Sequence, residues 1–170
     1  SYAGLLMMVF PFLMVIGSPL SGYLTDKIGP QKLVLIGLTL LSITQLLYVF
    51  MSQSSPIWYY VLATAIMGMG NALFQSPNNT IVMSSVEKEN LGVAGSMNSF
   101  ARNLGMVIGI ALSTTILYGG MSTAYGQRVT TYVNGRPDIF IYGMRVTFIA
   151  SLVICAVALM ISLVRFRKKR

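Results

Sequence analysis

The sequence lacks most of the side chains that enzymes and metal sites use. Its 170 residues include no histidine, one cysteine and only four acidic residues. A single cysteine cannot form a disulfide within the chain, and with so few carboxylates it cannot supply a metal cluster. The sequence also offers no carboxylate pair for acid–base catalysis and no serine beside a base. An enzyme and a metalloprotein are therefore both disfavoured.

Charge is scarce as well. Only 9% of the residues are charged and 55% are hydrophobic, whereas soluble domains carry about 25% charged residues. The mean hydropathy is +0.72. These values predict an all-α integral membrane protein, because helices satisfy their backbone hydrogen bonds within lipid.

The net charge of +8 could indicate a nucleic-acid partner, but the positions of the cations argue against it. Five of the twelve lysines and arginines fall within Arg165–Arg170, directly after an apolar run. This pattern is typical of the cytoplasmic flank of a membrane helix. We therefore expect no nucleic-acid binding.

Five apolar runs are long enough to cross a bilayer core, which needs about 20 residues per helix. They predict helices over residues of about 2–24, 33–51, 57–84, 91–118 and 139–164. The longest polar stretch, 119–138, predicts a loop, with Asp138 as the N-cap of the last helix.

An odd number of spans places the two ends of the chain on opposite sides of the membrane. The positive-inside rule places the basic tail 165–170 in the cytoplasm. The turns at 26–32 and 87–90 are then cytoplasmic, and the loops at 53–56 and 119–138 are external. We expect a multi-pass plasma-membrane protein.

The turn after the first predicted helix reads GYLTDKIGPQK over residues 22–32. It resembles the G-x-L-x-D-x-x-G-x-[RK]-[RK] loop of the major facilitator superfamily and matches it at Gly22, Leu24, Asp26, Gly29 and Lys32. Gly22 would let a neighbouring backbone approach, Asp26 would accept from helix N-terminal amides, and Gly29 would adopt a positive φ. The resemblance implies a conformational-gating loop; alternatively, any hairpin between membrane helices favours Asp, Gly and Lys.

The third predicted helix carries amide side chains at helical spacing. Asn71, Gln75 and Asn78 fall within about 60° of one another around a helix. Amides on one face of a membrane helix should point at other helices or at a wet cavity. They either line a substrate pathway or form interhelical hydrogen bonds.

The fourth predicted helix places Asn98, Arg102, Gly105 and Gly109 on one face. The two glycines predict a helix-packing surface. Arg102 lies about 15 Å beyond the preceding turn and is the strong charge farthest from a helix end. It is a substrate-pathway candidate by default, as is Asn98; alternatively, Arg102 reaches back to the cytoplasmic surface.

The third and fourth predicted helices together resemble the fourteen-helix drug:proton antiporters of the EmrB/QacA type. The similar features are Gly68-x-Gly70 followed by Pro77, and the pattern from Asn98 through Arg102 to Gly109. The resemblance implies most of a C-terminal six-helix bundle in a bacterial carrier, with a missing N-terminal bundle as its partner. It also implies efflux of small hydrophobic or cationic molecules, driven by a proton gradient without any other cofactor, and antibiotic resistance. The acid that would take the proton is not in this segment.

A second interpretation stays open: a small five-helix membrane scaffold or partner subunit without transport activity of its own. The chain starts with Ser1, not Met, inside an apolar run. We therefore expect a fragment of a larger carrier.

Overall fold

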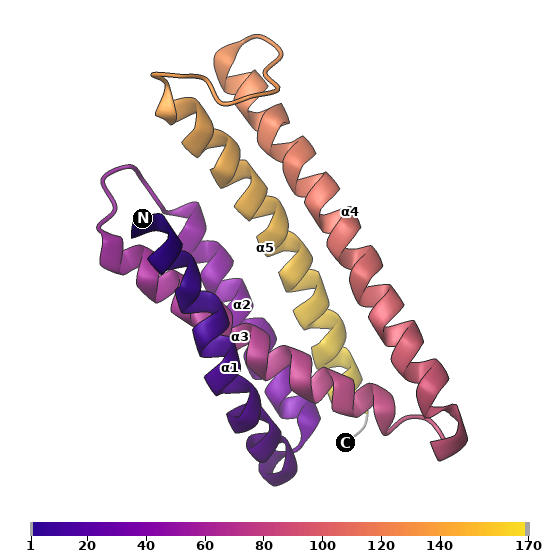
Figure 1. Ribbon diagram of the computed structural model, residues 1–170. Helices are drawn as coiled ribbons and strands as arrows, with labels where there is room; N and C mark the ends of the chain where they lie inside the picture. The colour runs from indigo at the N-terminus through magenta and orange to yellow at the C-terminus, as the bar shows by residue number, and fades with distance from the viewer. Residues whose placement is uncertain (1, 169–170) are drawn as a thin grey trace.

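The computed structural model describes residues 2–168, and long helices dominate this range (Figure 1). The elements are α1 (Tyr2–Ile28), α2 (Pro30–Val49), α3 (Ile57–Met83), the short 3-10 helix η1 (Lys88–Asn90), α4 (Leu91–Tyr125) and α5 (Pro137–Lys168). All five long helices are apolar enough to cross a membrane. The prediction of an all-α membrane protein with five spans is confirmed, and the described chain begins and ends at opposite ends of the bundle (Figure 1).

The five helices form a group of three and a pair. α3 packs along both α1 and α2, and these two contacts are the most extensive in the bundle. α4 and α5 form the pair, and α5 joins it to the group of three by packing against α2 on one side and α4 on the other (Figure 1). α4 contacts α3 only slightly, near its start. Because α3 and α4 touch so little, a cavity remains between them, and side chains of α1, α3 and α4 line it.

Glycine allows the helices to cross closely. A Cβ atom at Gly37 would lie 2.7 Å from the amide nitrogen of Phe74 and 2.9 Å from the carbonyl oxygen of Gly70. A Cβ atom at Gly143 would lie 2.7 Å from the carbonyl oxygen of Leu117. The α2–α3 and α4–α5 contacts therefore both depend on backbone-to-backbone approach.

The fourth helix is longer than the sequence predicts. The stretch 119–125, predicted as the start of the external loop, continues α4, and the connection to α5 shrinks to 126–136. Gly120 lies within the helix where α4 approaches α5 closely: a Cβ atom there would lie 3.1 Å from the Cα atom of Gly143. α4 ends instead at Gly126, which has a φ of 78° and so adopts the left-handed C-terminal conformation.

The last helix also differs from the prediction. α5 begins at Pro137, so Asp138 lies within its first turn and is not its N-cap. Proline suits this first position because its missing N–H would have no helical partner there. Asp138 instead pairs with Arg136, at 2.9 Å between Oδ2 and a guanidinium nitrogen. α5 runs on to Lys168, so the first part of the basic tail is helical; residues 169–170 lie outside the described residues.

Candidate functional site

The amide face of α3 points into the space between the helices. Asn71, Gln75 and Asn78 all line one cavity, as their spacing predicts. Asn79 joins them because it lies one helical turn after Gln75. All four amides are partly buried.

The opposing wall comes from α4. Asn98, Arg102 and Met106 follow one another at intervals of four residues and line the same cavity. The side-chain Nδ2 of Asn98 donates a hydrogen bond of 2.8 Å to Oδ1 of Asn79. Among the described residues this is the only side-chain hydrogen bond between α3 and α4. It holds the two helices together at a point where they otherwise barely touch.

The third wall is apolar. Phe10 and Met14, one turn apart on α1, complete the cavity. Its volume is about 690 Å³, within the roughly 300–1,000 Å³ typical of small-molecule sites. The lining residues are Phe10, Met14, Asn71, Phe74, Gln75, Asn78, Asn79, Asn98, Ala101, Arg102 and Met106. We call this space the amide cavity.

Arg102 is the only ionisable residue in the lining of the amide cavity. Its guanidinium makes no hydrogen bond or ion pair with any described residue. Five N–H donors therefore remain for an acceptor that enters the cavity. The amides and Arg102 line the same cavity; that they contact substrate stays a prediction.

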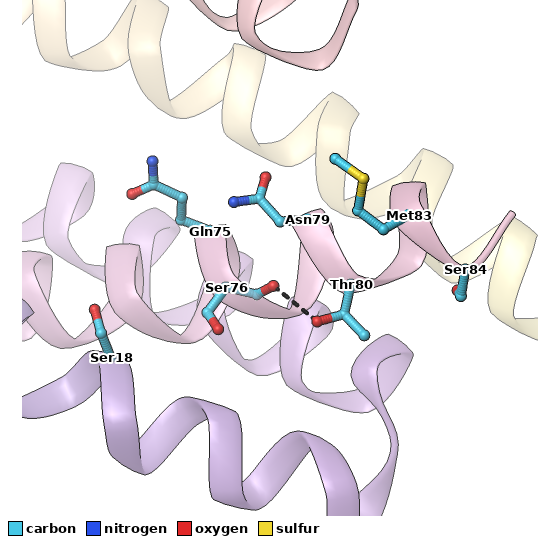
Figure 2. A pocket seen from close by; sticks show the side chains of 7 residues that line it. All are labelled: Ser18, Gln75, Ser76, Asn79, Thr80, Met83 and Ser84. Carbon is cyan, nitrogen blue, oxygen red and sulfur yellow. Dashed lines mark hydrogen bonds between the residues drawn. The ribbon is translucent and has the colours of Figure 1, made fainter. Parts of the chain in front are cut away.

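A second hollow adjoins the amide cavity along α3 and shares Gln75 and Asn79 with it. Its volume is about 670 Å³, and hydroxyls make up most of its polar lining. Figure 2 shows Ser18 of α1 facing this hollow, and Thr80, which donates to the Ser76 carbonyl at 3.2 Å. Gln75 and Asn79 extend from the opposite side of α3 in this view, toward the amide cavity (Figure 2).

A third hollow, of about 380 Å³, lies at the other end of the amide cavity and shares Phe10 with it. Tyr60, Thr64 and Met67 line it from α3, and Leu6 and Met7 from α1. The three hollows thus follow α3 from its first turns to its last residues. Their linings change from apolar and aromatic, through amides, to hydroxyls.

The turn between α1 and α2 is tighter than predicted, because a single residue, Gly29, separates the two helices. Its φ of 87° confirms the predicted positive φ. Asp26 and Lys32 are exposed and have no hydrogen-bonding partner among the described residues. A Cβ atom at Gly22 would meet no atom within 4 Å. No described residue makes the close approach predicted there, and the gating role of the turn stays a prediction.

The packing role predicted for Gly105 and Gly109 also finds no partner among the described residues. A Cβ atom at either position would meet no atom within 4 Å. Gly109 borders a separate cavity of about 230 Å³ between α2, α4 and α5, together with Gln45 and Cys155. The helix-packing glycines that the structure does show in α4 and α5, Gly120 and Gly143, were not recognised from the sequence.

The sequence did not identify the contributions of Asn79 and of α1 to the site. Asn79 could have been found from its spacing, since it lies four residues after Gln75. Phe10 and Met14 carry no such signal, because apolar residues surround them in the sequence. Only the packing of α1 against α3 reveals their role.

In the comparison with known proteins, one family model matches the whole chain. The family model described as Major Facilitator Superfamily matches residues 1–170. The riboflavin transporter RibZ of Clostridioides difficile is 24% identical over 166 residues, which is 98% of this chain and 35% of RibZ. No solved structure is significantly similar to the chain.

Two further relatives match a shorter part of the chain at higher identity. The multidrug resistance protein Stp of Mycobacterium tuberculosis is 32% identical over 122 residues, covering 72% of this chain and 22% of Stp. The uncharacterized transporter YebQ of Escherichia coli is 34% identical over 119 residues, covering 67% of this chain and 25% of YebQ. The chain therefore spans about a third or less of the length of these relatives.

Proposed function

The chain belongs to the major facilitator superfamily, and from this membership we propose that it forms part of a secondary transporter that works by alternating access in a bacterial plasma membrane. The observation that carries the proposal is the amide cavity, where polar side chains of α3 and α4 face an aromatic wall in a volume of about 690 Å³. A substrate would move along α3, through the three hollows, which share lining residues. The carrier is not an enzyme in this proposal.

The energy source in this proposal is a proton gradient, as in the fourteen-helix drug:proton antiporters. The acidic residues of this chain are Asp26, Glu87, Glu89 and Asp138, and all four are exposed at helix ends or in turns. None of them lines the amide cavity. The proton-carrying acid would therefore come from the rest of the carrier.

The proposed substrates are small hydrophobic or cationic molecules exported from the cell. The relatives' names, a riboflavin transporter and a multidrug resistance protein, support a small-molecule substrate, and riboflavin contains an aromatic ring system. Phe10 and Phe74 offer ring surfaces for such a molecule, and the amides offer hydrogen bonds. A cationic substrate would need a carboxylate from outside this chain, because Arg102 would repel it.

The test is transport by the full-length protein in everted membrane vesicles, with a panel of drugs and dyes and an imposed pH gradient. We expect efflux to stop when the gradient is collapsed. Arg102→Gln and Gln75→Ala should each lower efflux by about tenfold. Arg128→Gln, in the exposed loop, is the matched control and should leave it within about twofold.

Two outcomes would count against the proposal. If both cavity variants are expressed normally and show wild-type efflux, the amide cavity is not part of the substrate pathway. Absence of transport for every compound by the full-length protein would favour the five-helix scaffold or partner subunit.

A further inference from the structure

A small polar pocket, which shares Asn78 with the amide cavity, lies between the ends of α2, α3 and α5. Its polar lining consists of Gln31, Asn78, Ser162 and Arg165, and Phe166 contributes an aromatic edge. Its volume is about 70 Å³. That is about twice the ~30 Å³ that a water molecule takes in the liquid, and far below the roughly 300–1,000 Å³ of a small-molecule site. The pocket fits one compact chemical group and not a whole drug.

The pocket offers hydrogen-bond donors and no carboxylate. The guanidinium of Arg165 can donate two parallel hydrogen bonds, and the amides and the hydroxyl add further donors. None of these four polar side chains hydrogen-bonds to any described residue. Since all four face one pocket without bonding to each other, the arrangement suits a tetrahedral oxyanion such as phosphate.

The pocket lies at the level expected for the membrane surface. Arg165 is the first charged residue after the apolar run of α5, and Gln31 stands at the start of α2 beside Lys32. This is the level at which the headgroups of a bilayer lie. Val34, Ile81 and Phe166 give the pocket an apolar side that a free ion would not need.

We infer that this pocket binds the phosphate of an anionic phospholipid, with Arg165 as the main ligand and Gln31, Asn78 and Ser162 as further donors. Basic pockets between membrane helices at the cytoplasmic surface are suited to such headgroups. Asn78 also lines the amide cavity, but the role proposed for the pocket is not transport. The pocket would anchor the ends of α2 and α5 to the lipid surface. It does not depend on the substrate or on proton coupling.

The chain contains a matched control. Arg167 belongs to the same basic tail but lies about 200° around α5 from Arg165 and does not line the pocket. Arg165→Gln and Arg167→Gln change the net charge equally. Only the first removes a donor from the pocket.

The experiment uses the full-length protein in neutral detergent, titrated with cardiolipin or phosphatidylglycerol and observed by native mass spectrometry. We expect Arg165→Gln to weaken lipid retention by about tenfold, the value of one charge-assisted hydrogen bond. Arg167→Gln should change it by less than about twofold. If Arg165→Gln does not fold, Ser162→Ala and Gln31→Ala should each weaken retention in the same assay.

Three results would overturn the inference. Equal loss in the two arginine variants would mean that the tail attracts anionic lipid without a specific pocket. Unchanged retention in every pocket variant would mean that the pocket holds no lipid. Displacement of the lipid by excess inorganic phosphate, with equal retention of phosphatidylcholine, would assign the pocket to a soluble anion.

Discussion

At Gly37 the backbones of α2 and α3 lie so close that a side chain cannot fit between them. A Cβ atom there would stand 2.7 Å from the Phe74 amide nitrogen. We predict that Gly37→Ala lowers the apparent unfolding temperature of the full-length protein by several degrees, because overpacking costs about 1–3 kcal/mol. Size-exclusion chromatography after heating would measure it.

The control for this prediction is Gly119→Ala, at a helical glycine with no atom within 4 Å of its Cβ position. Alanine there should leave stability unchanged or raise it, since alanine favours a helix by about 1 kcal/mol over glycine. If both substitutions had the same effect, the close approach at Gly37 would not govern the packing of α2 on α3.

The hydrogen bond between Asn98 and Asn79 is an interhelical bond of the kind that the sequence left open for Asn71, Gln75 and Asn78. At 2.8 Å it is a structural link between α4 and α3. We predict a coupling of about 0.5–1.5 kcal/mol between Asn79→Ala and Asn98→Ala in a double-mutant cycle on unfolding. Additive effects on stability, accompanied by loss of transport, would instead assign both amides to substrate.

At the scale of the elements, a side chain of α5 forms a hydrogen bond with the end of α2. The Nε of Arg145 donates a hydrogen bond of 3.1 Å to the carbonyl oxygen of Val49, the last residue of α2. Carbonyls at a helix end have no helical donor and attract positive charge. We predict that Arg145→Gln lowers the unfolding free energy by about 1 kcal/mol or less, since Arg145 is exposed.

Thermal unfolding of Arg145→Gln beside Arg136→Gln would check this prediction. Arg136 pairs only with Asp138, at the exposed start of α5, so its loss should change stability less. A larger effect at Arg136 would mean that the loop, and not the crossing contact, holds α5 in place.

The helices themselves could be predicted because each is a long apolar run, but their ends depend on contacts between runs. The polar stretch 119–138 suggested a loop, yet α4 continues to Tyr125, and at Gly120 it approaches Gly143 of α5 closely. Asp138 suggested an N-cap, and the proline before it starts the helix instead. The first outcome depends on a contact between helices, whereas the second has a local signal, because proline favours the first position of a helix.

The residues of the candidate site also fall into those that the sequence could predict and those that it could not. The amides of α3 and Arg102 of α4 could be predicted because a polar residue in a membrane helix must face away from lipid. Phe10 and Met14 could not, because nothing in an apolar helix marks which side meets a cavity. The pocket around Arg165 also required the packed structure, since its donors come from three separate helices.

At the scale of the whole molecule, the arrangement fixes which connections share a side of the membrane but not which side faces the cytoplasm. The loop with Ser54 lies at one end of the bundle, and the turn with Ser85 lies at the other (Figure 1). Both serines are exposed. The positive-inside rule places the basic end of α5, and with it Ser85, in the cytoplasm.

Single cysteines at these positions test the orientation in a background where Cys155, the one cysteine of this sequence, and any cysteine elsewhere in the carrier are changed to serine. We predict that Ser54→Cys reacts with a membrane-impermeant maleimide in intact cells, and that Ser85→Cys reacts only after permeabilisation. The two substitutions are chemically identical, so a difference in labelling reports the side of the membrane. The reverse pattern would invert the chain and place Arg165 at the outer surface. Labelling of both in intact cells would contradict a chain that crosses the bilayer between them.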